Sequence, residues 1–282
     1  MRMTQTTLSG KEQEICLLDE PLNEGHVRAI KKTLESPYSL LLEEREKYSD
    51  SIYLPDWKEL VAMSSVPASE IDPRGVLLEP ATSYRMQAIR RGNANGIPAS
   101  ISCLTLTEDA EYVFGIRGGN VMRDAACIAP AGAIPYNTDS PLYDGIWQEM
   151  IEELGIRSDE LDNVLLYGWQ TDPELTKGVN FVFHANAARS SAQVHELHRE
   201  AFDVYQREKL KGASETGARR AIRTAGYPNT DAWEHTAIVF IKPEYIPEIV
   251  NERRVYHDGR PYQLLDIGRA PLIMRSALEA KK

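Results

Sequence analysis

The sequence predicts an α+β protein with a mixed sheet and helices on both faces of that sheet. Runs that are rich in β-formers, several of them alternating apolar and polar residues, recur between residues 99 and 242. Amphipathic helical segments separate these runs without a regular strand–helix–strand rhythm, so a Rossmann domain is not expected. The sequence also contains no Gly-x-Gly-x-x-Gly motif and no Walker A motif.

The first 95 residues combine helical and extended patterns. Helices are expected over residues 23–36, 38–48 and 55–63. The segment 72–80 suggests a short strand or an extended connection. The stretch RRGNANGIP, at 90–98, is rich in Gly and Asn and is the best candidate for a domain boundary. We therefore expect an N-terminal extension or accessory subdomain over residues 1–95 and a main domain over 96–282.

Extended segments dominate from residue 99 onward. Strands are expected over residues 99–107, 110–118, 125–134, 162–172, 178–187 and 234–242. The first two strands flank the turn EDA and should form a hairpin. Helices are expected over residues 140–156, 191–212, 243–253 and 268–282. Between them, residues 213–229 form a loop or a short helix.

Composition restricts the class of partner. The formal net charge is −10, which argues against broad binding of nucleic acid or of an anionic membrane. A small anionic substrate stays compatible, because a bound metal inverts the local charge. The three cysteines, Cys16, Cys103 and Cys127, are scattered and form no CxxC pair, which indicates a reducing cytoplasm. No apolar run is long enough for a membrane span, and the polar N-terminus lacks a signal sequence.

The most informative segment is SPLYDGIWQEMIEELGI, at residues 140–156. Glu149, Glu152 and Glu153 have the i, i+3, i+4 spacing that places side chains on one face of a helix. The opposite face carries an apolar stripe of Trp147, Met150, Ile151 and Leu154. Gly155 then suits a left-handed residue that ends the helix, with Ile156 folding back over the last turn.

The carboxylate face has two readings. Like charges at these spacings destabilise a helix by a few tenths of a kcal/mol per pair, and a bound divalent cation would remove that cost. Mg²⁺ takes oxygen ligands and typically uses one or two carboxylates together with waters and substrate phosphates. The alternative is an acidic face that is simply solvated.

The segment APAGAIPYNTDSPLYDGIWQEMIEELGI resembles the signature of the Nudix hydrolases. That signature has a Gly, a short loop with a glutamate, and then Arg-Glu-apolar-x-Glu-Glu-x-Gly-apolar. Residues 148–156 match eight of the nine positions of this second half. The resemblance covers roughly residues 97–282 and implies a Nudix-type α/β/α sandwich with a mixed sheet.

Three features depart from the family pattern. Gln148 stands where the family has arginine, and the loop that precedes it is one or two residues longer than usual. No glutamate occupies the loop position, where the nearest polar candidates are Asp139, Ser140 and Asp144. The Gln-Glu start, the long loop, the N-terminal extension and the late EHTAIVF strand are similar to one subgroup, the UDP-glucose/UDP-galactose diphosphatases.

The resemblance implies a chemistry and a set of residues. Glu149, Glu152 and Glu153 would be ligands of Mg²⁺ or Mn²⁺, and Gly132 would let the backbone approach the substrate. Glu152 or Glu153 would also help to deprotonate the attacking water. The implied reaction is metal-assisted hydrolysis of a nucleoside diphosphate linked to another group, X, to a nucleoside monophosphate and phospho-X.

Residues outside the signature carry further expectations. Glu234 precedes a strand where such enzymes often supply another carboxylate, so it is a candidate ligand or general base, or else an exposed strand start. His235 is expected to be a surface or a satisfied core residue. Arg117 ends a strand where family members often place a basic residue that faces the substrate. A basic cluster, Arg219, Arg220 and Arg223, suits either a lid over a diphosphate or a balance for the acidic surface.

Two other histidines and the rival functions complete the expectations. His195 and His198, at i, i+3, are expected on a mixed polar face, because zinc helices use a different spacing. One rival function is a catalytically impaired Nudix-fold module that binds a nucleotide or regulates, motivated by Gln148 and the missing loop glutamate. Another is an isoprenoid diphosphate isomerase, disfavoured because Cys103 and Cys127 lie in core strands. The first 95 residues would cap the site, form a homodimer interface or set substrate selectivity.

Overall fold

The computed structural model describes residues 1–48, 60–117, 125–173 and 178–281, and these residues form two compact units. Unit 1 contains residues 1–101, 132–145 and 165–182. Unit 2 contains residues 102–131, 146–164 and 183–282. Strands β6 (Ile97–Leu106), β10 (Leu161–Asp172) and β11 (Gly178–Ala187) contribute residues to both units. The sequence-based division at residues 95 and 96 stays a prediction.

Unit 1 begins with a β-hairpin that the sequence patterns did not indicate. Strand β1 (Arg2–Thr6) pairs antiparallel with β2 (Glu12–Leu22), and β2 continues the sheet onto β10 with Cys16 opposite Trp169. Gly10, at a φ of 85°, permits the turn between the first two strands. The Trp169 indole donates to the backbone oxygen of Ala68, at 2.9 Å. The N-terminal residues are therefore part of a sheet.

The rest of unit 1 is a small sheet with two helices. Strand β5 (Val76–Thr82) pairs in parallel with β3 (Ala29–Lys31) and antiparallel with β4 (Leu60–Ser64), and β4 in turn pairs with the start of β6. Helices α1 (Pro37–Tyr48) and α2 (Ser83–Arg90) complete this part of the unit. The core residues are Val61, Met63, Ala81, Met86 and Ile89.

Two of the helices predicted for this region do not form. Residues 23–36 form only a short 3-10 turn, η1 (Glu24–His26), followed by β3, whose Lys31 side chain donates to the backbone oxygen of Thr138 at 2.7 Å. Pairing with β5 thus overrides the local helical pattern. Residues 60–63 form the buried strand β4, because a short apolar run is compatible with either structure. The remainder of that expected helix, 55–59, lies outside the described residues.

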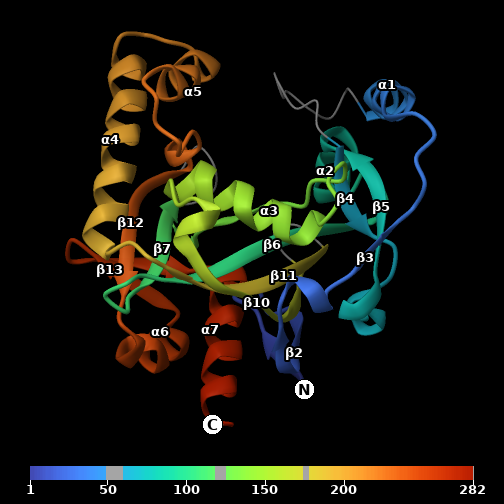
Figure 1. Cartoon of the computed structure of the whole chain (residues 1–282), viewed down its shortest axis with the longest axis horizontal. Helices are drawn as coiled ribbons and strands as arrows, with labels where there is room; N and C mark the ends of the chain where they lie inside the picture. Colours follow the sequence, from blue (N-terminus) through green and yellow to red (C-terminus); the bar gives the residue numbers. More distant parts are fainter. Residues whose placement is uncertain (49–59, 118–124, 174–177, 282) are drawn as a thin grey trace. The chain divides into compact units, whose positions relative to one another are not determined.

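Unit 2 is built on a mixed sheet. Strands β6, β7 (Tyr112–Arg117), β8 (Ala125–Ile128), β14 (Arg260–Leu264) and β13 (Arg254–His257) follow one another, and β12 (His235–Ile241) also pairs with β7. The β8–β14 pair is parallel and the others with a defined register are antiparallel. Figure 1 shows β12 beside β7, with the long helix α4 (Ser191–Leu210) running along the same part of the unit.

The period-two alternation along these strands sends side chains to two faces. On one face Phe114, Ile128 and Val239 pack with Ile246 and Leu272, from helices α6 (Ile246–Glu252) and α7 (Asp266–Glu279). The other face meets α4 and the turn of residues 150–154 that extends helix α3 (Pro141–Glu149), where the Thr105 hydroxyl contacts the Met150 sulfur. Helices thus cover both faces of a mixed sheet, and the predicted α/β/α sandwich is confirmed for this unit.

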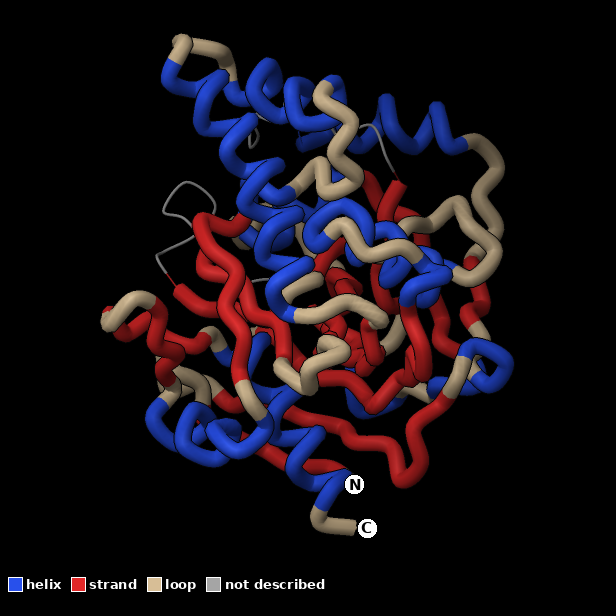
Figure 2. Tube along the Cα trace, turned by 60° about the vertical axis from the view of Figure 1, so that its left-hand side comes forward, coloured by secondary structure: helices blue, strands red, loops and turns tan. Residues whose placement is uncertain are grey.

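A helical hairpin completes unit 2. Helix α4 begins after Ser190, whose hydroxyl accepts from the backbone N–H of Gln193, and it ends before Gly212, which has a φ of 86°. The chain then turns into α5 (Glu215–Thr224), which packs against α4 around Tyr205, Ala218 and Ile222. Figures 1 and 2 show the short connection that joins the end of α4 to the start of α5.

Candidate functional site

The acidic helix forms where the sequence predicts it, with one difference in its last turn. Helix α3 runs to Glu149 and continues as a π-helical turn, η5 (Met150–Leu154), which has i to i+5 hydrogen bonding. Gly155 ends the turn in a left-handed conformation, with a φ of 71°, and the N–H of Ile156 folds back to the oxygen of Met150 at 3.1 Å. The predicted glycine cap is confirmed.

The wider turn changes which glutamates face outward. Met150 and Leu154 are fully buried, as expected, while Glu149 and Glu152 are half-buried. Glu153 is only 1% exposed and points into unit 2, where the sequence pattern expected an outward side chain. A π turn places its residues at different angles from an α-helix, and the strands below offer two donors to this carboxylate.

Both oxygens of Glu153 accept hydrogen bonds. Oε1 accepts from the backbone N–H of Ala131, at 3.2 Å, and Oε2 accepts from Nε2 of His235, at 2.9 Å. Burial lowers the pKa of His235, but the neighbouring Cys127 thiol and the Glu153 carboxylate outweigh it and raise that pKa to about 10. The raised pKa favours the imidazolium form of His235, which places a positive charge beside Glu153 and avoids a lone buried charge.

The ring of His235 lies against a glycine. A Cβ added to Gly115 would stand 2.1 Å from Nδ1 and 2.4 Å from Cε1 of His235. No side chain fits at this position of β7 unless the imidazole moves. Glycine at residue 115 thus permits the close approach that brings His235 to Glu153. His235 is therefore a core residue. The sequence had left open whether it lies in the core or on the surface.

The site contains a second pair of opposite charges. Arg117 ends β7, and its Nη2 lies 3.2 Å from Oε2 of Glu234, which precedes β12. Burial raises the pKa of Glu234 most, Glu153 and Asp231 raise it further, and Arg117 opposes them, so that the pKa is about 7. Burial lowers the pKa of Arg117, but Cys127, Glu234 and Glu153 raise it above its ordinary value. Arg117 therefore stays charged beside Glu234.

The other two helical glutamates lie close to the same carboxylates. Burial raises the pKa of Glu149 well above its ordinary value, and the charges of Glu153, Glu234, Glu152 and Asp231 add to this, in that order. Gln148 donates to Oε1 of Glu152, at 3.2 Å, so the glutamine orients this carboxylate. The backbone N–H of Asp231 donates to the backbone oxygen of Glu152, at 2.7 Å.

The structure thus brings five predicted residues into one region of unit 2. These are Arg117, Glu149, Glu152, Glu153 and Glu234. Gly132 lies in β9 (Ala131–Ala133), directly after the residue whose N–H donates to Glu153. Asp144, a candidate for the missing loop carboxylate, instead accepts from the backbone N–H of Ser140 at the start of α3.

Sequence reasoning missed one acidic residue and undervalued one histidine. Asp231 follows a turn and has no motif around it, and the one available signal was its position three residues before Glu234. Burial raises the pKa of Asp231, and Glu153 raises it further, while Trp233 Nε1 donates to its Oδ1 at 3.1 Å. His235, next to Glu234, gave no signal of its link to Glu153.

One further histidine and two cysteines are buried. His198 was expected on a mixed polar face, but it is buried, and its Nε2 donates to the backbone oxygens of Ala232 and His235, at 3.1 and 3.0 Å. Cys103 and Cys127 are buried in strands, as predicted. Within residues 1–48, 60–117, 125–173 and 178–281, no three His, Cys, Asp or Glu side chains are already gathered around a point that could hold a metal ion.

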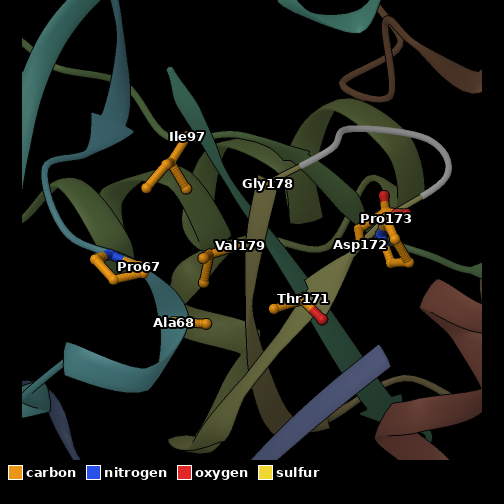
Figure 3. Close-up of a pocket in the computed structure, with 8 residues that line it drawn as sticks. All are labelled: Pro67, Ala68, Ile97, Thr171, Asp172, Pro173, Gly178 and Val179. Carbon is orange, nitrogen blue, oxygen red and sulfur yellow. The ribbon is translucent and has the colours of Figure 1, made fainter. Parts of the chain in front are cut away.

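A cavity of about 270 Å³ lies in unit 1, and none of the candidate site residues lines it. Figure 3 shows its lining, which is mostly apolar and includes Pro67, Ile97 and Val179 together with Thr171 and Asp172. Its lining provides no cationic side chain and only one carboxylate, that of Asp172, which does not suit an anionic substrate. Among the helices in the described part of the chain, none is both long and apolar enough to cross a bilayer.

Comparisons with known proteins give weak likenesses. No family model matches the chain, and no curated protein matches it. A MutT protein from Methanosarcina mazei Go1 is 17% identical, with 66% of this chain and 96% of that chain covered and a TM-score of 0.36. An Ap4A hydrolase from C. elegans is 11% identical over 65% and 99%, with a TM-score of 0.33.

A third solved structure is a NUDIX family hydrolase from Clostridium perfringens. It is 13% identical over 66% of this chain and 99% of that chain, with a TM-score of 0.30. TM-scores this far below 0.5 do not establish a common function, so the chemistry of this chain depends on its own residues.

Proposed function

We propose that this protein is a Nudix-type, Mg²⁺- or Mn²⁺-dependent diphosphatase. Its substrate would be a nucleoside diphosphate linked to another group, X, and its products a nucleoside monophosphate and phospho-X. The observation that carries the proposal is that Glu149, Glu152, Glu153, Asp231 and Glu234, on and beside one π-helical turn, lie near enough for their charges to act on one another, although their side chains do not already converge on one point. Five acids at one place are costly to keep together unless a cation joins them.

The residues present fit such an ion. Carboxylate oxygens are the ligands that Mg²⁺ prefers, and it needs only one or two of them when waters and substrate phosphates fill the other positions. Glu149 and Glu152 are half-buried and accessible, and they would supply these ligands. Glu153 would add a ligand through the lone pairs that Ala131 and His235 leave. When bound, the ion supplies positive charge to the diphosphate and makes water easier to deprotonate.

Other side chains would hold and prepare the reactants. Glu234 has a pKa of about 7, which suits a general base, and we assign it the proton from the attacking water. Arg117 holds Glu234 in place and offers its charge to a phosphate oxygen. Gln148 orients Glu152 through a hydrogen bond, so the replacement of the family's arginine does not remove this contact. Gly132, which follows Ala131, would let the substrate approach the backbone.

The test is a panel of nucleoside diphosphate derivatives, nucleotide sugars included, with and without Mg²⁺ or Mn²⁺. We expect metal-dependent release of a nucleoside monophosphate from at least one member. Glu152→Gln should lower kcat by about a hundredfold or more, the usual effect of removing one charge-stabilising group. Glu196→Gln, at an exposed glutamate on α4, is the matched control and should leave kcat unchanged.

A nucleotide-binding module without hydrolysis is the second candidate. It is favoured by the fact that both oxygens of Glu153 are already engaged by the protein. Thermal stabilisation by a panel member, with no product formed under any metal condition, would identify this function and overturn the enzymatic one.

A further inference from the structure

Helix α5 places an arginine in a fixed position near the carboxylates. The guanidinium of Arg219 lies over the ring of Trp233, 3.4 Å from its centroid, and its Nε donates to Glu215 at 3.2 Å. Trp233 in turn donates to Asp231, whose own N–H donates to the oxygen of Glu152. A continuous chain of contacts therefore leads from Arg219 to the acidic helix.

A second arginine shares this face of α5. Arg223 is four residues after Arg219, so both side chains lie on the same side of the helix. The charges of both arginines act on Asp231 and lower its pKa against the raising effect of burial. Within the described residues, Arg223 takes part in no ion pair, and its side chain is exposed. Arg220 points about 100° away from Arg219 and about 60° away from Arg223 around the helix, and its charge is not among the main ones that act on Asp231.

The guanidinium groups of Arg219 and Arg223 and the nearby carboxylates attract ligands of opposite charge. The carboxylates attract a metal and, through it, the scissile diphosphate. Arg219 and Arg223 attract anions directly, and the planar fork of a guanidinium matches a phosphate group. Stacking on Trp233 and bonding to Glu215 hold Arg219 in place, so less conformational entropy is lost when an anion binds.

We propose that Arg219 and Arg223 bind a phosphate that the substrate carries beyond the scissile diphosphate. This inference rests on the proposed diphosphatase function and narrows its substrate class. The group X would be anionic, as in a polyphosphate chain, whereas a neutral sugar at this position would offer neither arginine a phosphate. The simpler explanation, that these arginines only balance nearby acids, predicts an effect on stability and none on substrate preference.

The experiment compares a nucleoside triphosphate with a nucleoside diphosphate sugar as substrates. Arg223→Gln should lower kcat/KM for the triphosphate about tenfold, while kcat/KM for the sugar derivative stays within twofold. Arg220→Gln, at the residue directly after Arg219 on the same helix, is the matched control. It should change kcat/KM for neither substrate. Thermal unfolding of each variant shows whether the fold is retained.

A binding measurement keeps the inference testable without turnover. Calorimetry with inorganic tripolyphosphate and with pyrophosphate, both with Mg²⁺, should give a Kd for tripolyphosphate that weakens about tenfold in Arg223→Gln. The Kd for pyrophosphate should be unchanged. Equal Kd values for Arg223→Gln and Arg220→Gln would overturn the assignment of these arginines. A wild-type protein that hydrolyses no panel member would overturn the diphosphatase instead, and calorimetry would still decide the role of Arg223.

Discussion

The contact between Gly115 and His235 gives a quantitative prediction. In Gly115→Ala, the new Cβ would stand 2.1 Å from Nδ1 of His235, whereas ordinary contacts begin at about 3.5 Å. The imidazole therefore has to move by roughly 1 Å. Its bond to Glu153 is 2.9 Å long, and such a shift carries it past the range of a hydrogen bond. The variant thus breaks a buried charge pair without altering either partner.

The size of the effect follows from that broken pair. Breaking a buried ion pair costs about 3–5 kcal/mol, because it leaves an uncompensated charge. For a domain of this size each kcal/mol lowers Tm by roughly 2–4 °C, so we expect a decrease of roughly 6–20 °C. Urea unfolding and thermal unfolding, followed by circular dichroism, measure it. Gly25→Ala is the control, because its Cβ would approach nothing closer than 3.5 Å.

A double-mutant cycle identifies the cause. If the ring of His235 is what Cβ meets, Gly115→Ala should cost much less in a His235→Ala background, where that ring is absent. A coupling energy above about 1 kcal/mol is expected between the two sites. Additive losses, or a Gly115→Ala protein as stable as the wild type, would refute the packing argument.

Two further predictions concern metal and pH. Mg²⁺ at ten times its Kd should stabilise the folded protein by about 1.4 kcal/mol, and Glu149→Gln should abolish this rise in Tm if Glu149 is a ligand. Burial above all, and the charge of His235, lower the pKa of His198 to about 4, so the folded state disfavours its protonation. Stability from this group is present above the unfolded pKa of about 6.5 and is lost as the pH falls toward 4, by up to about 3 kcal/mol. His198→Gln retains a donor for the two carbonyls, and urea titrations at pH 7 and 4.5 should show a smaller acid loss than in the wild type. An identical acid loss would place the titrating group elsewhere.

Local patterns predicted the parts of the fold that local interactions determine. The helix that carries the glutamates and the cap at Gly155 follow from neighbours within one turn, and both are present. The pairing of β3 with β5 joins segments more than 40 residues apart, which no window of periodicity detects. The hairpin β13–β14 was missed because RVYH and RPYQL are short and mainly polar.

The candidate site divides in the same way. Three acids were found because they share one helix, whose periodicity is visible in the sequence. The inward position of Glu153 was not predictable, because it depends on His235, which is 82 residues away in the chain. Asp231 was missed for a related reason, since its closeness to the helix results from a backbone hydrogen bond to Glu152. Long-range pairing, and not residue type, decides which acids meet.

The distribution of charge explains how such a site is stable before any ion binds. Two of the acids already have cations, since Glu153 faces the imidazolium of His235 and Glu234 faces Arg117. Among the described residues no cation is paired with Glu149, and burial first, then the neighbouring carboxylates, raise its pKa well above the ordinary value. A bound metal would offset both effects. The two buried pairs fix the framework, and the remaining glutamates stay adjustable. The protein can in this way hold the acidic centre in place before an ion arrives, while Glu149 and Glu152 remain able to bind a cation.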